Sequence, residues 1–130
     1  MATIKHIAIR TTEVEKTAAF YKEAFGLKQV GLGQSGVYLS DGHINLAILK
    51  CEPPKEGGNP RVGIDHLGFQ VEDVDVTLAR IDKLGGRPLT DRLEVTHGDP
   101  SHPRSYYEIK CVGPDNQVID ISAAGWVGAD

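Results

Sequence analysis

His6 is the first residue of this chain that could do chemistry, and it lies inside the apolar, strand-like run IKHIAIR. A second histidine, His66, lies in a similar run, IDHLGFQV, sixty residues later. Imidazole nitrogen is a common metal ligand, so a histidine on one face of a strand can belong to a metal site. It can equally be a core residue that is hydrogen-bonded to a neighbour. The residues around each histidine distinguish a metal ligand from a core residue.

The two histidines occupy equivalent positions in an internal repeat. Residues 4–26 and 64–86 align without a gap, which also places Glu13 on Asp73 and Gly26 on Gly86. Each copy has the pattern of a strand, an acidic helix start, about three helical turns and a glycine. Three short strands are expected after each helix. The sequence therefore predicts a βαβββ unit twice, and a repeat of this kind fixes the architecture.

The helices and strands follow from apolar spacing and turn residues. We expect Thr12 to be the N-cap of the first helix and Gly26 to end it. The expected buried faces are Val14, Thr17, Ala18, Tyr21 and Phe25 in the first helix and Val74, Leu78, Ile81 and Leu84 in the second. The strands after the helices are predicted at about 28–32, 35–40 and 43–50, and then at 87–91, 105–112 and 118–122.

Two turns set the strand register. Asp41-Gly42 is typical of a two-residue hairpin turn, which would pair Ser40 with His43. The run GPDNQ predicts a five-residue loop that places Asp120 opposite Lys110. Residues near 92–104 are expected to form a loop.

The organisation that follows is an α+β fold in one domain. Two tandem βαβββ modules, at about 3–51 and 64–122, would form a curved mixed sheet around a central cavity. A linker rich in proline and glycine joins them at 52–63, and a tail follows at 123–130.

Strand alternation sorts the side chains between two faces. One face carries mostly isoleucine, leucine, valine and phenylalanine, which suits packing against the helices. The opposite face carries an unusual number of polar groups: His6, Arg10, Asn45, His66, Gln70, Glu108, Lys110 and Asp120. Packing alone does not account for this asymmetry, which indicates a functional cavity.

Composition excludes several classes of protein. The chain has 130 residues and a net charge of −4, and its basic residues are scattered, so nucleic acid is not an expected partner. No apolar run approaches the ~18 residues of a membrane span. Two cysteines do not make a disulfide framework, and we expect a reduced, cytoplasmic protein.

The paired units with a histidine in the first strand of each resemble the vicinal oxygen chelate superfamily. That family includes glyoxalase-type lyases, methylmalonyl-CoA epimerases, extradiol dioxygenases and fosfomycin resistance enzymes. The runs VEKTAAFYKEAFGLK and GPDNQVIDIS are similar to its "FY…LG" and "DPDGN…E" signatures. The resemblance extends over about residues 3 to 122 and implies a homodimer.

The resemblance implies a ligand set for one divalent metal ion, which could be Zn, Ni, Co, Mn or Fe. His6 and His66 match the two histidine ligands, and Asp120 matches the carboxylate ligand, which is Glu in most members. Asn45 falls where glyoxalase lyases have a fourth ligand, Glu, and epimerases have Gln. Asp120 is one methylene shorter than Glu, and Asn45 is a poor ligand. We place Asn45 among the substrate-binding residues.

The other polar residues of this face receive roles in catalysis or binding. Glu108 is the candidate general base, and a surface ion pair with Lys110 or Arg104 is its alternative. Lys110 and Arg10 could hold an anionic group of a substrate or simply neutralise Asp120 and Glu108. Gln70 and Tyr38 could form hydrogen bonds in the cavity. His97 and His102 are expected to be solvated loop residues, and a lid loop is the alternative. Trp126 is expected at an edge or a subunit contact.

Three functions remain open. The first is a glyoxalase-like lyase or isomerase that acts on a small molecule with adjacent oxygens through a metal-stabilised enediolate. The second is an Fe(II) extradiol dioxygenase, whose ligands are two histidines and one carboxylate. The third is a non-catalytic small-molecule binding protein of the bleomycin-resistance type. Metal content, metal identity and oxygen consumption distinguish the three.

Overall fold

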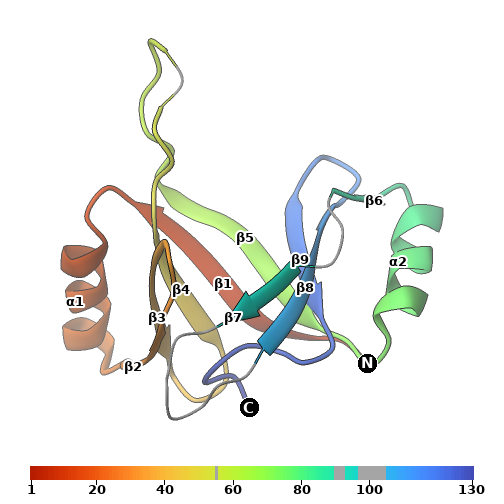
Figure 1. The fold of residues 1–130 in the computed structure, drawn as a ribbon, viewed down its shortest axis with the longest axis horizontal. Helices are drawn as coiled ribbons and strands as arrows, with labels where there is room; N and C mark the ends of the chain where they lie inside the picture. Colours follow the sequence, from red (N-terminus) through yellow and green to blue (C-terminus); the bar gives the residue numbers. More distant parts are fainter. Residues whose placement is uncertain (55, 90–92, 97–104) are drawn as a thin grey trace.

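The computed structural model describes residues 1–54, 56–89, 93–96 and 105–130, and these form two helices and nine strands (Figure 1). In chain order they are β1 (Thr3–Thr11), α1 (Val14–Phe25), β2 (Lys28–Leu32), β3 (Gly36–Ser40), β4 (Asn45–Lys50), β5 (Gly63–Gln70), α2 (Val74–Lys83), β6 (Arg87–Pro88), β7 (Leu93–Thr96), β8 (Ser105–Val112) and β9 (Val118–Ser122). Neither helix in these ranges is long and apolar enough to cross a membrane.

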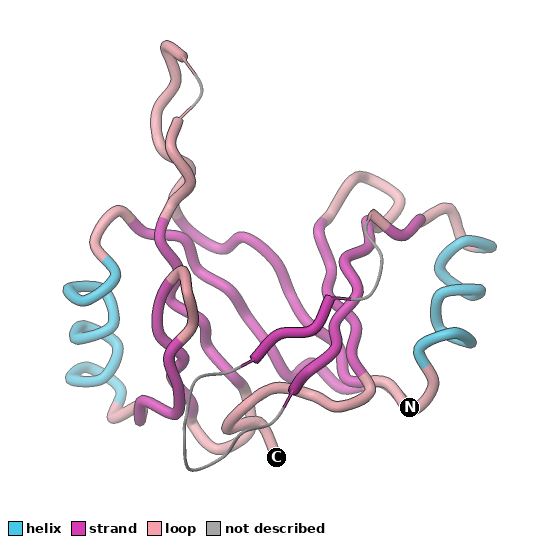
Figure 2. The backbone as a smooth tube through the Cα atoms, in the orientation of Figure 1, coloured by secondary structure: helices cyan, strands magenta, loops and turns pink. Residues whose placement is uncertain are grey.

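The strands form one curved, open sheet in the order β2-β3-β4-β1-β5-β9-β8-β6, with β7 paired to β8. The first strands of the two repeats, β1 and β5, are antiparallel neighbours at the centre of this sheet. Each pairs on its other side with the last strand of its own repeat, β4 or β9, in parallel. Figure 2 shows a helix flanking each end of the sheet. The predicted α+β fold and curved mixed sheet are confirmed.

Each helix covers a separate apolar core. Ala18 of α1 packs with Leu39 and Ile48, and Ile109, Cys111 and Ile121 form the core beneath α2. Because apolar residues of the strands are used on this side, the alternate residues are left to the opposite face of the sheet. Phe25 and Leu84, predicted to be buried, are 65% and 74% exposed, because they lie where the helices end and leave the sheet.

The helix ends agree with the predictions at one point and differ at another. Gly26 ends α1 in the left-handed region, with φ 69°, and its N–H donates to the carbonyl of Lys22. The N-cap is Glu13 and not Thr12, and its side chain makes no capping bond. The hydroxyl of Thr11 accepts a hydrogen bond from the N–H of Glu13, so the threonine that reaches the helix start lies one residue earlier.

The first predicted hairpin has the wrong register. Ser40 pairs with Asn45, so residues 41–44 form a four-residue loop. The carboxylate of Asp41 accepts hydrogen bonds from the N–H groups of His43 and Ile44, which stabilises this longer turn. A register shift of two residues keeps Asn45 on the predicted face. The second hairpin is as predicted, with Lys110 opposite Asp120.

The second half differs from the prediction in its outer strands. The strand predicted at 87–91 has only two residues, Arg87–Pro88. Within the predicted loop 92–104, residues Leu93–Thr96 form β7 and pair with β8. His97, His102 and Arg104 lie outside the described residues.

Candidate functional site

The register of the five central strands aligns polar residues in one row across the sheet. Asn45 on β4 is opposite His6 on β1, and His6 is opposite Gly68 on β5. Gly68 in turn is opposite Asp120 on β9, which is opposite Lys110 on β8. His66 lies two residues from Gly68 on the same strand, so it faces the same side. Residues far apart in the sequence are therefore brought to one site.

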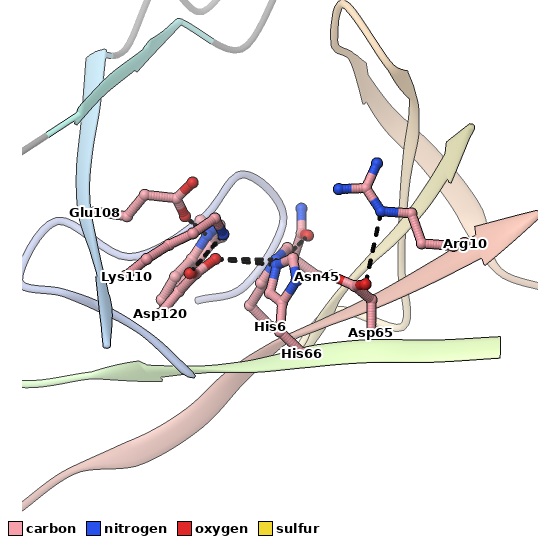
Figure 3. Close-up of polar contacts among 9 residues, drawn as sticks. His6, Arg10, Asn45, Asp65, His66, Glu108, Lys110 and Asp120 are labelled. Atoms are coloured by element: carbon pink, nitrogen blue, oxygen red, sulfur yellow. Dashed lines mark hydrogen bonds and ion pairs between the residues drawn. The ribbon is translucent and has the colours of Figure 1, made fainter. Parts of the chain in front are cut away.

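Three electron-rich atoms converge at this site (Figure 3). The Nε2 atoms of His6 and His66 are 3.2 Å apart, and Oδ2 of Asp120 lies 3.0 Å from Nε2 of His66 and 4.0 Å from Nε2 of His6. The three residues are only 4%, 6% and 0% exposed. Two nitrogens bound to one zinc ion at tetrahedral angles are roughly 3.3 Å apart. The spacing of the two rings fits ligation of a single ion.

The far side of each ring is held by an acceptor. Nδ1 of His6 donates to Oδ1 of Asn45 at 2.7 Å, and Nδ1 of His66 donates to Oδ2 of Asp65 at 2.6 Å. The amide nitrogen of Asn45 donates to the carbonyl of Val127, which fixes the orientation of that amide. With hydrogen on both Nδ1 atoms, the lone pairs of both Nε2 atoms point toward Asp120. Such partners orient the ligands of metal sites.

The electrostatics of His6, His66 and Asp120 favour a bound cation. Burial lowers the pKa of His6 to about 4. Burial also acts against charge on His66, but contact with the Asp120 carboxylate raises the pKa of His66 above its usual value. Burial would raise the pKa of Asp120, yet His66 and Lys110 lower it to about 2. The carboxylate of Asp120 therefore brings negative charge next to two imidazole rings.

The buried carboxylate of Asp120 suits a divalent ion. Within the described residues, its Oδ2 has no hydrogen-bond partner, although it lies 3.0 Å from Nε2 of His66. Its other oxygen, Oδ1, accepts a hydrogen bond from Nζ of Lys110 at 2.7 Å. Unpaired buried oxygens are costly, and two imidazoles with a carboxylate suit a transition metal. His6, His66 and Asp120 form a group that could hold a metal ion.

A cavity of about 170 Å³ opens beside the rings of His6 and His66. Its lining comes from five strands and the tail: His6, Arg10, Tyr38, Ala47, Leu49, His66, Glu108, Lys110 and Trp126. Oε2 of Glu108 accepts a hydrogen bond from Nε1 of Trp126 at 3.1 Å. Burial, together with the charge of Asp120, raises the pKa of Glu108 to about 7. A carboxyl group of this kind can exchange protons near neutral pH.

The structure brings most of the predicted site residues into this cavity. Arg10, Tyr38, Glu108 and Lys110 line it beside the two histidines. Asn45 is fully buried, and its amide is bonded to His6 and to the tail. Gln70 donates to the carbonyl of Ala123 and so also holds the tail.

Trp126, expected at an edge or a subunit contact, is instead 3% exposed and lines the cavity. The tail turns back across the sheet after β9. Composition and periodicity do not reveal such a turn.

Asp65 was missed by the sequence interpretation. Strict alternation places it on the opposite face from His66, yet its carboxylate bonds to the ring of His66. A β-bulge explains this, because Ala8 pairs with His66 and Ile9 pairs with Ile64, which leaves Asp65 without a register partner. Oδ1 of Asp65 also lies 3.8 Å from Nε of Arg10 (Figure 3). The neighbouring glycine, Gly63 with φ 100°, is the one local signal of the irregular backbone.

The central strands of this curved sheet hold two imidazoles and a carboxylate, a ligand set that could bind a transition metal ion. The sequence model of the Glyoxalase/Bleomycin resistance protein/Dioxygenase superfamily matches residues 3–116. The chain belongs to this superfamily, and the predicted family is confirmed.

Individual relatives come from more than one branch of the superfamily. The chain is 26% identical over 120 residues to mitochondrial methylmalonyl-CoA epimerase from Homo sapiens, which covers 80% of this chain and 68% of the epimerase. A solved methylmalonyl-CoA epimerase in complex with methylmalonyl-CoA and NH4+ has a TM-score of 0.63 at 17% identity, covering 94% of each chain. The 2,3-dioxygenase LapB from Pseudomonas sp. KL28 has a TM-score of 0.65 at 22% identity, covering 96% of this chain and 41% of LapB.

Asp65 should control metal affinity through the orientation of His66. We expect Asp65→Ala to weaken Co²⁺ binding about 10- to 100-fold, because the ring of His66 loses its anchoring acceptor. Asp65→Asn keeps an acceptor without the charge and should lose less. Titration with Co²⁺, followed by its visible absorption, measures both, with Glu52→Ala at an exposed position as the control. Wild-type affinity in Asp65→Ala would contradict this role.

Proposed function

We propose that the chain is a metal-dependent enzyme, a lyase or isomerase of the glyoxalase type, that moves a proton on a small substrate with adjacent oxygens. The observation that carries this proposal is that Glu108 lines one cavity with His6 and His66, two members of the candidate ligand group. A base beside a metal ion suits removal of a proton from carbon next to a carbonyl group. The curated epimerase relative is an isomerase, which supports this branch of the family.

His6, His66 and Asp120 are proposed to hold one divalent ion, which could be Zn, Ni, Co, Mn or Fe. When bound, such an ion supplies a Lewis acid that stabilises negative charge on a substrate oxygen. The short side chain of Asp120 is no obstacle to this role. Lys110 binds Oδ1, which leaves Oδ2 directed at the two histidines. A single carboxylate oxygen is then the ligand.

The remaining cavity residues are proposed to bind and reprotonate the substrate. Glu108 accepts the proton from carbon and can return it to the same carbon or to its neighbour. Lys110 and Arg10 bring positive charge to the cavity and suit a substrate that carries an anionic group. Tyr38 offers a hydroxyl group, and Leu49 provides an apolar wall. A cavity of about 170 Å³ favours a small reacting group.

Glu108→Gln tests this function directly. Protein loaded with Co²⁺ is incubated in D₂O with 2-hydroxy ketones, hemithioacetals of 2-oxoaldehydes and methylmalonyl-CoA, and the α-proton signal is followed by NMR. We expect the wild type to exchange or convert at least one of these compounds. Glu108→Gln should lower that rate about 10²- to 10⁴-fold at unchanged cobalt content, because the amide cannot accept the proton.

Glu52→Gln, at an exposed position, is the matched control for this substitution. An unchanged rate in Glu108→Gln would show that another group is the base. If no compound with an exchangeable proton reacts, the lyase or isomerase proposal loses its support.

A second candidate is an Fe(II) extradiol dioxygenase. Two histidines and one carboxylate are the ligand set of many non-haem iron oxygenases, and LapB shares the fold. Oxygen uptake by Fe(II)-loaded protein with catechols separates the candidates. One O₂ consumed per catechol would favour the dioxygenase, whereas binding of a small molecule without turnover would favour a non-catalytic binding protein.

We also propose a cytoplasmic homodimer. The two cysteines, Cys51 and Cys111, are free and buried, which suits a reducing compartment. Exposed apolar side chains on the central strands include Ile4, Ile64 and Leu67, and a second copy would cover such residues. Light scattering on an eluting size-exclusion peak should give about twice the 14.1 kDa mass of one chain. A mass of one chain at micromolar concentration would contradict the dimer.

A further inference from the structure

We propose that Trp126 is a positioning residue of the metal site. The C-terminal tail (123–130), which holds the indole in place, therefore belongs to this site. One side of the indole would hold the ring of His6, and its N–H would hold the carboxylate of Glu108. The inference rests on the proposed function, which gives these two residues the roles of ligand and base. It extends that function to a segment that lies beyond the residues matched by the family model.

The contact with His6 is a parallel stack. The centroids of the indole and imidazole rings are 4.9 Å apart, and their planes differ by 5°. The hydrogen bond to Asn45 fixes one edge of the imidazole, but the ring could still tilt about that bond. A flat surface against the face of the ring prevents this tilt. The stack therefore fixes the direction in which Nε2 of His6 points.

The contact with Glu108 is a directed hydrogen bond. Nε1 of Trp126 donates to Oε2 of Glu108 at 3.1 Å, and an indole N–H can only donate. A carboxylate side chain has several rotamers, and this bond favours the one that faces the cavity. Because one rigid side chain makes both contacts, the distance between the ligand ring and the base is fixed by the indole.

The tail is anchored at several points, so the indole has a fixed place. Gln70 donates to the carbonyl of Ala123, Ser40 donates to that of Gly128, and Lys5 donates to that of Asp130. Asn45 bonds to Val127 and to His6, which links the tail directly to the ligand. In Figure 1 the tail, in dark blue, crosses below the strands before it reaches the C-terminus.

The sheet also provides room for the indole. Gly68 lies between His6 and Asp120 in the row across the sheet. A Cβ atom at this position would be 2.6 Å from Cβ of His6 and 2.8 Å from ring carbons of Trp126. Glycine is therefore required where the indole approaches the strand beside the ligands.

Conservative and non-conservative substitutions separate positioning from filling. Trp126→Phe keeps an aromatic face on His6 and loses the N–H, and it should bind Co²⁺ within about threefold of the wild type. Trp126→Leu and Trp126→Met fill space without a flat face. These two variants should bind Co²⁺ at least about tenfold more weakly than the wild type. Phe25→Leu, at an exposed aromatic position, is the control. Circular dichroism confirms that each variant is folded.

The hydrogen bond has its own measurement. Trp126 is the only tryptophan of the chain, so a ¹⁵N spectrum contains one indole N–H signal. In Zn²⁺-loaded protein this proton should exchange slowly with water, and its signal should move in Glu108→Gln but not in Glu52→Gln. This readout needs no variant of Trp126 and no substrate.

Three outcomes decide the inference. Weaker Co²⁺ binding in the leucine and methionine variants only, with a protected indole N–H, supports it. Wild-type affinity in all Trp126 variants, when His66→Ala has lost Co²⁺ binding, overturns it and leaves the proposed metal site intact. Failure of the wild type to bind Co²⁺ overturns the metal-dependent function and the inference with it.

Discussion

Three lone pairs facing one another in a buried place are the constraint on which this site depends. Nε2 of His6, Nε2 of His66 and Oδ2 of Asp120 would repel one another without a positive charge among them. The ammonium of Lys110 bonds to the far oxygen of Asp120, and contact with this carboxylate raises the pKa of His66 against the effect of burial. A divalent ion, as proposed, would supply a stronger positive charge to all three atoms. Asn45 and Asp65 accept hydrogen bonds from the Nδ1 atoms of the two rings, which leaves the Nε2 atoms directed toward Asp120.

The fold creates this constraint through the pairing of β1 with β5. Each repeat alone supplies one histidine, and only the antiparallel pair at the centre of the sheet brings the two rings within 3.2 Å. The parallel neighbours β4 and β9 then add the amide of Asn45 and the carboxylate of Asp120 at the same level. Since the two apolar cores lie under the helices at the ends of the sheet, on its other face, polar residues here do not disrupt them. The repeat is thus the origin of both the architecture and the site.

The sequence alone predicts the architecture and the residues on regular strands. Period-two alternation places His6, His66, Glu108, Lys110 and Asp120 on one face, and the sixty-residue repeat predicts that the histidines are equivalent. Alternation fails at Asp65, because a bulge turns two consecutive side chains to the same face. It also fails at Trp126, since the path of a non-repetitive tail depends on tertiary hydrogen bonds from Gln70, Asn45 and Ser40. In the hairpin at Asp41 the register differs from the prediction by two residues, and Asn45 lies on the predicted face only because this number is even.

The most direct test of the account is the metal content of protein purified without a histidine tag. Elemental analysis by mass spectrometry would be run on the wild type, His66→Ala and Asp120→Ala, each shown to be folded by circular dichroism. The account predicts about one divalent metal ion per wild-type chain, as purified or after reconstitution, and its loss in both variants. A folded wild type that takes up no metal, or variants that retain a full equivalent, would contradict it.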